Sequence, residues 1–277
     1  MIIDSHQHFW EYKPSKDSWI DESMNAIRKD FLPKDLKDTY VRHNIDGCIA
    51  VQAEQSEEEN QLLLDLAHKN PFIRGVVGWL DLCAYDINEK LAKFSSYPLF
   101  KGVRHILQSE QKGFTERKQF QNGIAKLGQF NLTYDILVYP NQLEESLALV
   151  QKFPNQPFVL DHMGKPDIKS GKIEDWKKKV ELLAECKNVF CKLSGMVTEA
   201  DWYNWSFQDL KPYVDVIFDS FGTDRILFGS DWPVCLLAAE YEEVFEVTQK
   251  FIKSLSDVEQ ALIMGGNAAK VYKLDLS

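Results

Sequence analysis

PFVLDHMG, residues 157–164, is the stretch of this sequence that decides the fold. It begins as a short apolar run and passes directly into the polar pair Asp161 and His162. The stretch at residues 47–53, GCIAVQA, has the same near-continuous apolar character. Strands that are covered on both faces have this appearance, and such strands usually belong to parallel sheets. The two stretches therefore predict a parallel sheet with helices on its faces.

Eight runs of this kind alternate with longer segments of helical period. We expect strands at residues 2–4, 47–53, 74–82, 102–107, 132–138, 158–162, 189–194 and 226–230. We expect helices at residues 36–43, 57–69, 87–94, 116–130, 142–153, 174–186, 208–221 and 241–254, with a last helix at 257–264 that ends at a Gly265-Gly266-Asn267 break. Ser56, with Glu59 three residues later, predicts a capping box at the start of the second helix. Because no linker rich in Pro, Gly or Ser interrupts the pattern, we expect one domain, residues 1–277, folded as an α/β barrel of the (β/α)8 TIM type.

Composition and charge exclude several classes of protein. With 277 residues, 44% apolar and 12% aromatic, the chain is too rich in core-forming residues to be disordered. Lys plus Arg is 32 and Asp plus Glu is 42, so the net charge of −10 argues against nucleic-acid binding. The opening MIIDSHQHFW does not resemble a signal peptide, and no run approaches the ~20 apolar residues of a membrane helix. Five cysteines, mostly within apolar runs, fit reduced thiols, so we expect a cytoplasmic protein; the oligomeric state is left open.

The predicted barrel indicates where an active site should lie. Active sites of such barrels are built at the C-terminal ends of the strands. Unusual polar and aromatic residues fall at these ends throughout the chain, which predicts a site there. They include His6, His8, Trp79, Arg104, His105, His162, Asp231 and Trp232.

The pair His6 and His8 is the first candidate. Side chains two apart on an extended segment point to the same side, so both imidazoles can address one point. That arrangement suits a divalent metal or two donors on one carbonyl oxygen, and the alternative is two solvated loop histidines. Asp231 ends the eighth strand, where a carboxylate can deprotonate a water or ligate a metal beside the histidines; its alternative is a cap for the next helix.

The other candidates have structural alternatives as well. His162 offers a hydrogen bond or a proton, or is a satisfied core histidine. Arg104 and His105 offer a fixed charge and an imidazole for substrate binding, although Arg104 could instead pair with Asp135 or Asp161. For Lys192 an ion pair at the mouth of the core is the favoured reading. We also expect Trp79 and Trp232 to bind substrate. The long connection at 9–33 carries Trp10, Tyr12, Trp19 and Phe31, which suit either a lid over a sugar or a packed cap.

Several of these motifs occur together in a known family. The sequence resembles the amidohydrolase superfamily, and more narrowly its "amidohydrolase 2" branch of lactonases. The resemblance implies a distorted (β/α)8 barrel that hydrolyses a small lactone. It also implies that Asp231 is the general base toward water, and that His6, His8 and His162 polarise the carbonyl or protonate the leaving alkoxide. The motifs that carry it are IDSHQHFW (3–10), GVRH (102–105), LDHMGKP (160–166), KLSG (192–195), FGSDWP (228–233) and GNAA (266–269).

The departures from the superfamily pattern narrow the expectation. The fourth strand ends in Arg104 and His105, and the fifth has no histidine, which argues against a two-metal centre. One divalent metal, with zinc the first choice, is expected on His6, His8 and Asp231, or no metal at all. Arg104 is the single arginine placed at a strand end, so a neutral sugar lactone fits better than a dicarboxylate. The alternatives are a metal-dependent decarboxylase of the same branch and a non-catalytic carbohydrate-binding barrel.

Overall fold

The strands form one parallel sheet in which each strand pairs with the next along the chain. This arrangement is seen in a computed structural model that describes residues 1–275; residues 276 and 277 of the predicted domain lie outside the described residues. The strands are β1 (Ile3–Gln7), β2 (Gly47–Val51), β3 (Ile73–Gly78), β4 (Phe100–His105), β5 (Thr133–Ile136), β6 (Phe158–Leu160), β7 (Val189–Leu193) and β8 (Ile226–Phe228).

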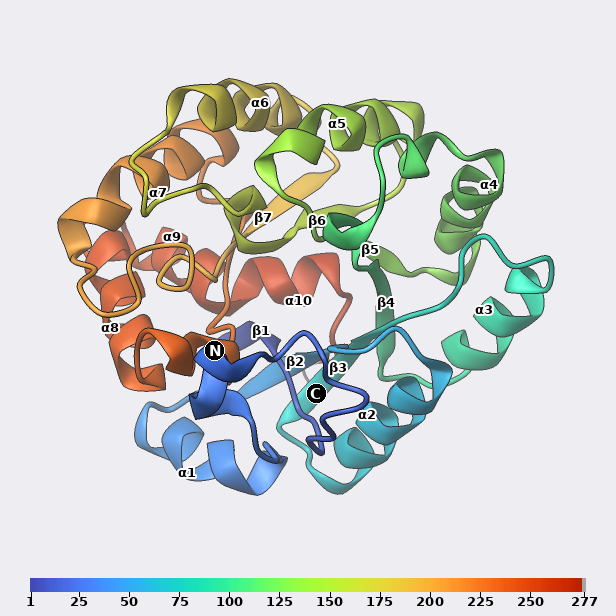
Figure 1. Ribbon diagram of the computed structural model, residues 1–277, viewed down its shortest axis with the longest axis horizontal. Coiled ribbons are helices and arrows are strands. Elements are labelled where there is room, and N and C mark those ends of the chain that lie inside the picture. Colours follow the sequence, from blue (N-terminus) through green and yellow to red (C-terminus); the bar gives the residue numbers. More distant parts are fainter. Residues whose placement is uncertain (276–277) are drawn as a thin grey trace.

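A helix follows each strand, and together these helices form a ring outside the sheet (Figure 1). They are α1 (Pro33–Arg42), α2 (Glu57–Lys69), α3 (Ile87–Ser95), α4 (Lys118–Leu127), α5 (Leu143–Lys152), α6 (Glu174–Ala184), α7 (Phe207–Phe221) and α8 (Tyr241–Ile252), followed by α9 (Asp257–Ala261) and α10 (Asn267–Val271). The predicted (β/α)8 TIM barrel is confirmed. None of the helices described between residues 1 and 275 combines the length and apolar character needed to cross a bilayer.

The barrel closes where its first and last strands meet. Gln7 forms an isolated parallel bridge with Trp232. The His8 amide donates to the Trp232 carbonyl (2.7 Å), and the Asp231 amide donates to the His6 carbonyl (2.8 Å). These backbone bonds hold the segment after β8 against β1, so residues more than 220 positions apart become neighbours.

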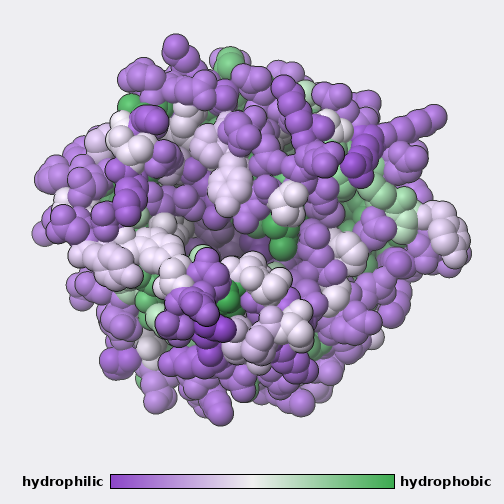
Figure 2. All heavy atoms as spheres, in the orientation of Figure 1, coloured by the Kyte–Doolittle hydropathy of each residue, from purple (hydrophilic) through white to green (hydrophobic). Residues whose placement is uncertain are grey.

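The end of the barrel away from His8 and Asp231 is filled by the C-terminal segment. Val271 and Tyr272 are buried in one apolar cluster with strand residues that include Ile3, Val51 and Leu227. In Figure 1 helix α10 runs behind the strands, across the end of the barrel away from the viewer. The face toward the viewer is hollowed near its centre; most of this face is hydrophilic, and residues of intermediate hydropathy with a few hydrophobic ones border the hollow (Figure 2).

Several predicted boundaries were wrong by two to four residues, for example the end of the third strand at Gly78, and three differences matter most for the site and the chain end. Strand β1 runs to Gln7, so His6 lies inside the strand and not after it. Strand β6 stops at Leu160, because His162 and Met163 have left-handed backbone conformations in a turn over Asp161–Gly164. The predicted break at Gly265 is instead a π-helical turn, Leu262–Gly266, that joins α9 to α10. A Cβ at Gly265 would lie 2.7 Å from the Met1 carbonyl oxygen, so this glycine permits close packing and does not end the helix.

The predicted capping box is half right. The Ser56 hydroxyl accepts from the Glu59 amide (3.2 Å), as expected. The Glu59 carboxylate does not return to Ser56; it accepts from the amides of Ala53 (3.1 Å) and Glu54 (2.7 Å). Glu59 therefore ties the start of α2 to the end of β2.

The 9–33 connection packs as a cap, at least at its two ends. Trp10 and Phe31 are both 3% exposed and lie 5.6 Å apart between ring centroids. Phe31 also contacts Trp232, with 5.1 Å between centroids. Trp19 is 42% exposed and remains available at the surface.

Candidate active site

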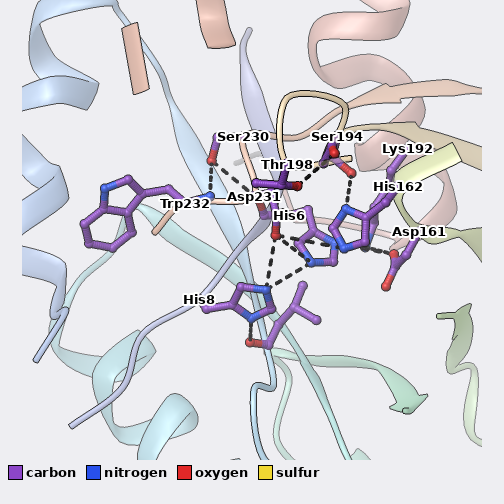
Figure 3. A network of polar contacts seen from close by, with 12 residues as sticks. His6, His8, Asp161, His162, Lys192, Ser194, Thr198, Ser230, Asp231 and Trp232 are labelled. Carbon is purple, nitrogen blue, oxygen red and sulfur yellow. Dashed lines mark hydrogen bonds and ion pairs between the residues drawn. The ribbon is translucent and has the colours of Figure 1, made fainter. Parts of the chain in front are cut away.

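Three imidazoles and one carboxylate converge at the mouth of the barrel. Asp231 Oδ1 lies 3.8 Å from His6 Nε2, 3.6 Å from His8 Nε2 and 3.9 Å from His162 Nε2. All four residues are buried. Figure 3 shows their side chains turned toward one another: His6 comes from β1, His8 directly follows that strand, and His162 and Asp231 come from the segments after β6 and β8. The sequence predicted these four as catalytic residues, and the fold brings them together.

The hydrogen bonds of His8 fix its chemical form. Its Nδ1 lies 2.8 Å from the Val51 carbonyl oxygen, which can only accept. Nδ1 therefore carries the proton when the ring is neutral, and Nε2 presents a lone pair to the site. A carbonyl acceptor on the far ring nitrogen orients metal-binding and proton-accepting histidines in this way.

His162 is held by the loop that follows β7. Its Nδ1 lies 3.0 Å from the Ser194 hydroxyl oxygen, and its ring centroid is 4.3 Å from that of His6. Gly195 has φ +64°, and a Cβ there would lie 2.6 Å from His162 Nδ1. Glycine is needed at this position both for the left-handed backbone and for the close approach of the ring.

A chain of buried charges lies beneath the histidines. Lys192 Nζ donates to Asp135 Oδ2 (2.6 Å) and lies 2.9 Å from Asp161 Oδ1 and 3.1 Å from His6 Nδ1. Arg104 Nη1 donates to Asp161 Oδ2 (3.1 Å). The ion pairs considered for Lys192 and Arg104 are therefore present, and each of these two buried cations has a carboxylate partner.

Burial keeps the histidines neutral. Desolvation, followed by the charge of Lys192, holds the pKa of His6 well below its ordinary value. Desolvation also lowers the pKa of His8, and it lowers that of His162 to about 4. Neutral imidazoles near pH 7 can ligate a metal or accept a proton.

Asp231 is kept ionised in spite of its burial. Desolvation raises its pKa, but the positive charge of His162, the hydrogen bond from His8 and the charge of Lys165 outweigh this, so the pKa is lowered. Because His162 is neutral at pH 7, Lys165 is the cation among these groups that persists there. Lys165 Nζ is paired with Glu199 Oε1 at 3.1 Å.

Sequence reasoning missed the role of Asp4. This fully buried carboxylate accepts from the Ser230 amide (2.9 Å) and hydroxyl (2.6 Å), and from the hydroxyls of Tyr40 (3.0 Å) and Tyr241 (3.2 Å). It therefore anchors the residue before Asp231 to β1. A carboxylate directly after the apolar pair Ile2 and Ile3 was the available signal.

The predicted substrate-binding residues have different surroundings. Trp79 Nε1 donates to His105 Nδ1 (3.2 Å), and His105 Nε2 lies 2.9 Å from Glu110 Oε1, so both ring nitrogens of His105 have protein partners. Arg104 Nη1 lies 3.3 Å from His6 Nε2 and so reaches the catalytic cluster. The Trp232 ring is 5% exposed and points away from the imidazoles (Figure 3). The substrate contacts of these residues stay predictions.

The donor set fits one metal ion. His6 Nε2 and His8 Nε2 are 3.2 Å apart, and the carboxylate oxygen of Asp231 lies 3.6–3.8 Å from them. Tetrahedral zinc ligands, each about 2.0–2.1 Å from the ion, are about 3.3 Å from one another. These three residues form a candidate metal-binding group, and His6, Asp161 and His162 form a second group that uses the same histidine. The residue types and spacing suit a single divalent ion.

Comparison with known proteins agrees with this geometry. The chain is 38% identical to an L-fucono-1,5-lactonase of Burkholderia multivorans, covering 98% of this chain and 96% of the relative. It is 34% identical to an L-fucono-1,5-lactonase of Burkholderia ambifaria, covering 99% and 96%. A zinc-bound amidohydrolase structure from Burkholderia multivorans superposes with a TM-score of 0.96 at 37% identity, over 99% of this chain and 100% of that one.

The predicted family and hydrolase class are confirmed, whereas the decarboxylase alternative gains no support. A 2,6-dihydroxybenzoate decarboxylase from Rhizobium shares 15% identity with a TM-score of 0.67, which shows a common fold alone. The amidohydrolase family model matches residues 3–274, almost the whole chain. The barrel, the converging histidines and this match together place the chain in the amidohydrolase family.

Proposed function

We propose that this protein opens a neutral sugar lactone by hydrolysis, with L-fucono-1,5-lactone as the first substrate to test. The observation that carries the proposal is the buried convergence of Asp231 on the Nε2 atoms of three neutral histidines. Two relatives that share more than a third of their residues with this chain are L-fucono-1,5-lactonases.

In this proposal Asp231 receives a proton from the attacking water, because it is ionised and lies beside the Nε2 atoms of three imidazoles at the mouth of the barrel. His8 presents a lone pair at Nε2, so it orients the water or shares its proton. Arg104 Nη1, beside His6, supplies a positive charge to the oxygen that becomes negative when the carbonyl is attacked. A lactone is an activated ester, so its carbonyl needs less electrophilic help than that of an amide.

The leaving alkoxide must gain a proton as the ring opens. His162 is the group we assign to this step, because its Nδ1 contacts the Ser194 hydroxyl while its Nε2 faces Asp231. The proton that Asp231 takes from water can return to the alkoxide through this ring. A zinc ion on His6, His8 and Asp231, when bound, supplies a Lewis acid for the carbonyl and lowers the pKa of water. Zinc is the metal bound in the related structure from Burkholderia multivorans. The cytoplasmic location expected from the sequence stays a prediction.

The test is lactone opening followed by a pH indicator. The panel is L-fucono-1,5-lactone, L-rhamnono-γ-lactone and 2-pyrone-4,6-dicarboxylate, and we expect the neutral sugar lactones to be opened faster. Asp231→Asn should lower kcat by about 10²-fold or more, the usual contribution of a positioned base. Asp215→Asn, an exposed carboxylate paired with Lys211, is the matched control and should leave turnover unchanged. Unchanged turnover in Asp231→Asn would refute the assignment of the base.

A further inference from the structure

His6 has a hydrogen-bond donor beside each of its two ring nitrogens, and one neutral tautomer cannot accept from both. Lys192 Nζ is 3.1 Å from Nδ1, and Arg104 Nη1 is 3.3 Å from Nε2. Both cations can only donate, whereas a neutral imidazole has one acceptor and one donor nitrogen. One of the two contacts must therefore be unfavourable, and the tautomer of His6 decides which.

The two tautomers satisfy different neighbours. With the proton on Nε2, the ring donates to His8 Nε2 (3.2 Å) and Nδ1 accepts from Lys192 (3.1 Å). With the proton on Nδ1, the ring donates to Asp161 Oδ1 at 3.4 Å and Nε2 accepts from Arg104 at 3.3 Å. The first pair of bonds is shorter, and His8 is an acceptor there because its own proton is on Nδ1. The contacts favour the Nε2–H tautomer.

A metal ion requires the opposite tautomer. To ligate through Nε2 beside His8 and Asp231, His6 must carry its proton on Nδ1, where Lys192 already donates. Lys192 is completely buried between Asp135 and Asp161 and contacts no other imidazole nitrogen in the described structure. It thus opposes metal binding through a hydrogen bond as well as through its charge.

We propose that Lys192 is a positioning residue that holds His6 as the Nε2–H tautomer and thereby sets how strongly the site binds a divalent metal. In this state the His6 N–H that donates to His8 Nε2 lies in the site, and it can donate to the lactone carbonyl oxygen instead when substrate is bound. The inference concerns the site assigned under the proposed function. Its tests measure the tautomer and zinc affinity, so it can fail while lactone hydrolysis holds.

The tautomer is measured by NMR of chelator-treated protein labelled with 15N in histidine, with the His6 signals assigned from their loss in His6→Gln. We expect the proton of His6 on Nε2 in the unmodified protein. The charge-balanced variant Lys192→Met/Asp135→Asn removes one buried cation and one buried anion, and it should move the proton to Nδ1. Asp135→Asn alone keeps Lys192 and is the matched control; the proton should stay on Nε2.

Zinc affinity is measured on the same proteins by competition with a chromophoric chelator. The double variant should bind zinc at least about tenfold more tightly than the unmodified protein, since a buried donor a few ångströms from a ligand atom opposes a cation strongly. Circular dichroism confirms that each variant is folded. A proton on Nδ1 in the unmodified protein, or equal zinc affinity in the double variant, would overturn the proposal, as would a tautomer change in Asp135→Asn alone.

Discussion

Gly195→Ala tests whether the placement of His162 matters for catalysis. A methyl group there would lie 2.6 Å from His162 Nδ1, whereas ordinary contact begins at 3.4 Å, so the ring must shift by 3.4 − 2.6 = 0.8 Å. His162 has little room for this shift, because its Nδ1 contacts Ser194 at 3.0 Å. A misplacement of about 1 Å can cost about 10²-fold in rate. We therefore expect kcat/KM for the best lactone to fall by about 10²-fold.

A matched glycine separates the clash from backbone strain. Gly171 has φ +70°, close to the +64° of Gly195, but a Cβ at Gly171 would have no atom within 4 Å. Each alanine variant should lose about 1–2 kcal/mol for the left-handed backbone. Gly195→Ala should lose about 1–3 kcal/mol more through overpacking.

The assays are urea unfolding and lactone opening at a series of substrate concentrations. Gly171→Ala should keep the kcat/KM of the unmodified protein, because Gly171 has no neighbour to displace. Full activity in Gly195→Ala, or equal losses of stability in the two variants, would refute the reasoning that His162 must stay where Gly195 allows it.

Three further predictions concern stability. Lys192→Met should lower the free energy of unfolding in urea by about 3–5 kcal/mol, because it removes a buried cation from Asp135 and Asp161. Adding Asp135→Asn should recover part of this loss. Equal stability of the single and the double variant would contradict the proposed ion-pair network. Phe31→Ala should cost about 3–5 kcal/mol, because its ring packs on Trp10 and Trp232, whereas a loss below 1 kcal/mol would point to a loose lid. Burial raises the pKa of Glu59 from 4.5 to about 7, so the folded state holds this proton more tightly than the unfolded state. Stability should therefore fall by on the order of 3 kcal/mol as the pH rises from 4.5 to 7. Glu59→Gln should lose this dependence, and parallel pH profiles of the two proteins would count against it.

The sequence predicted the barrel because its strands are short, apolar and regularly separated by helical segments. It predicted His6, His8, His162 and Asp231 because polar residues directly after apolar strands must lie at one end of a parallel barrel. It misjudged strand ends, as at β6, where the left-handed turn at His162 has no signal in a pattern of apolar residues. It also predicted a helix break at Gly265, where glycine is instead needed because the backbone of Met1 and Ile3 lies too close for a side chain.

By itself the sequence determined which residue types reach the mouth of the barrel, because alternation and strand order depend on local pattern. Only the tertiary structure decided how they are used. Lys192 and Asp135 lie in two strands and Asp161 in the turn after a third, and their pairing depends on distances between these segments that no local pattern contains. The same holds for the proton on His8, which a carbonyl 43 residues away fixes, and for the competing contacts of His6. Hydrogen-bond partners that are distant in the sequence thus set the protonation of the site, whereas the residues of the site could be identified from the sequence alone.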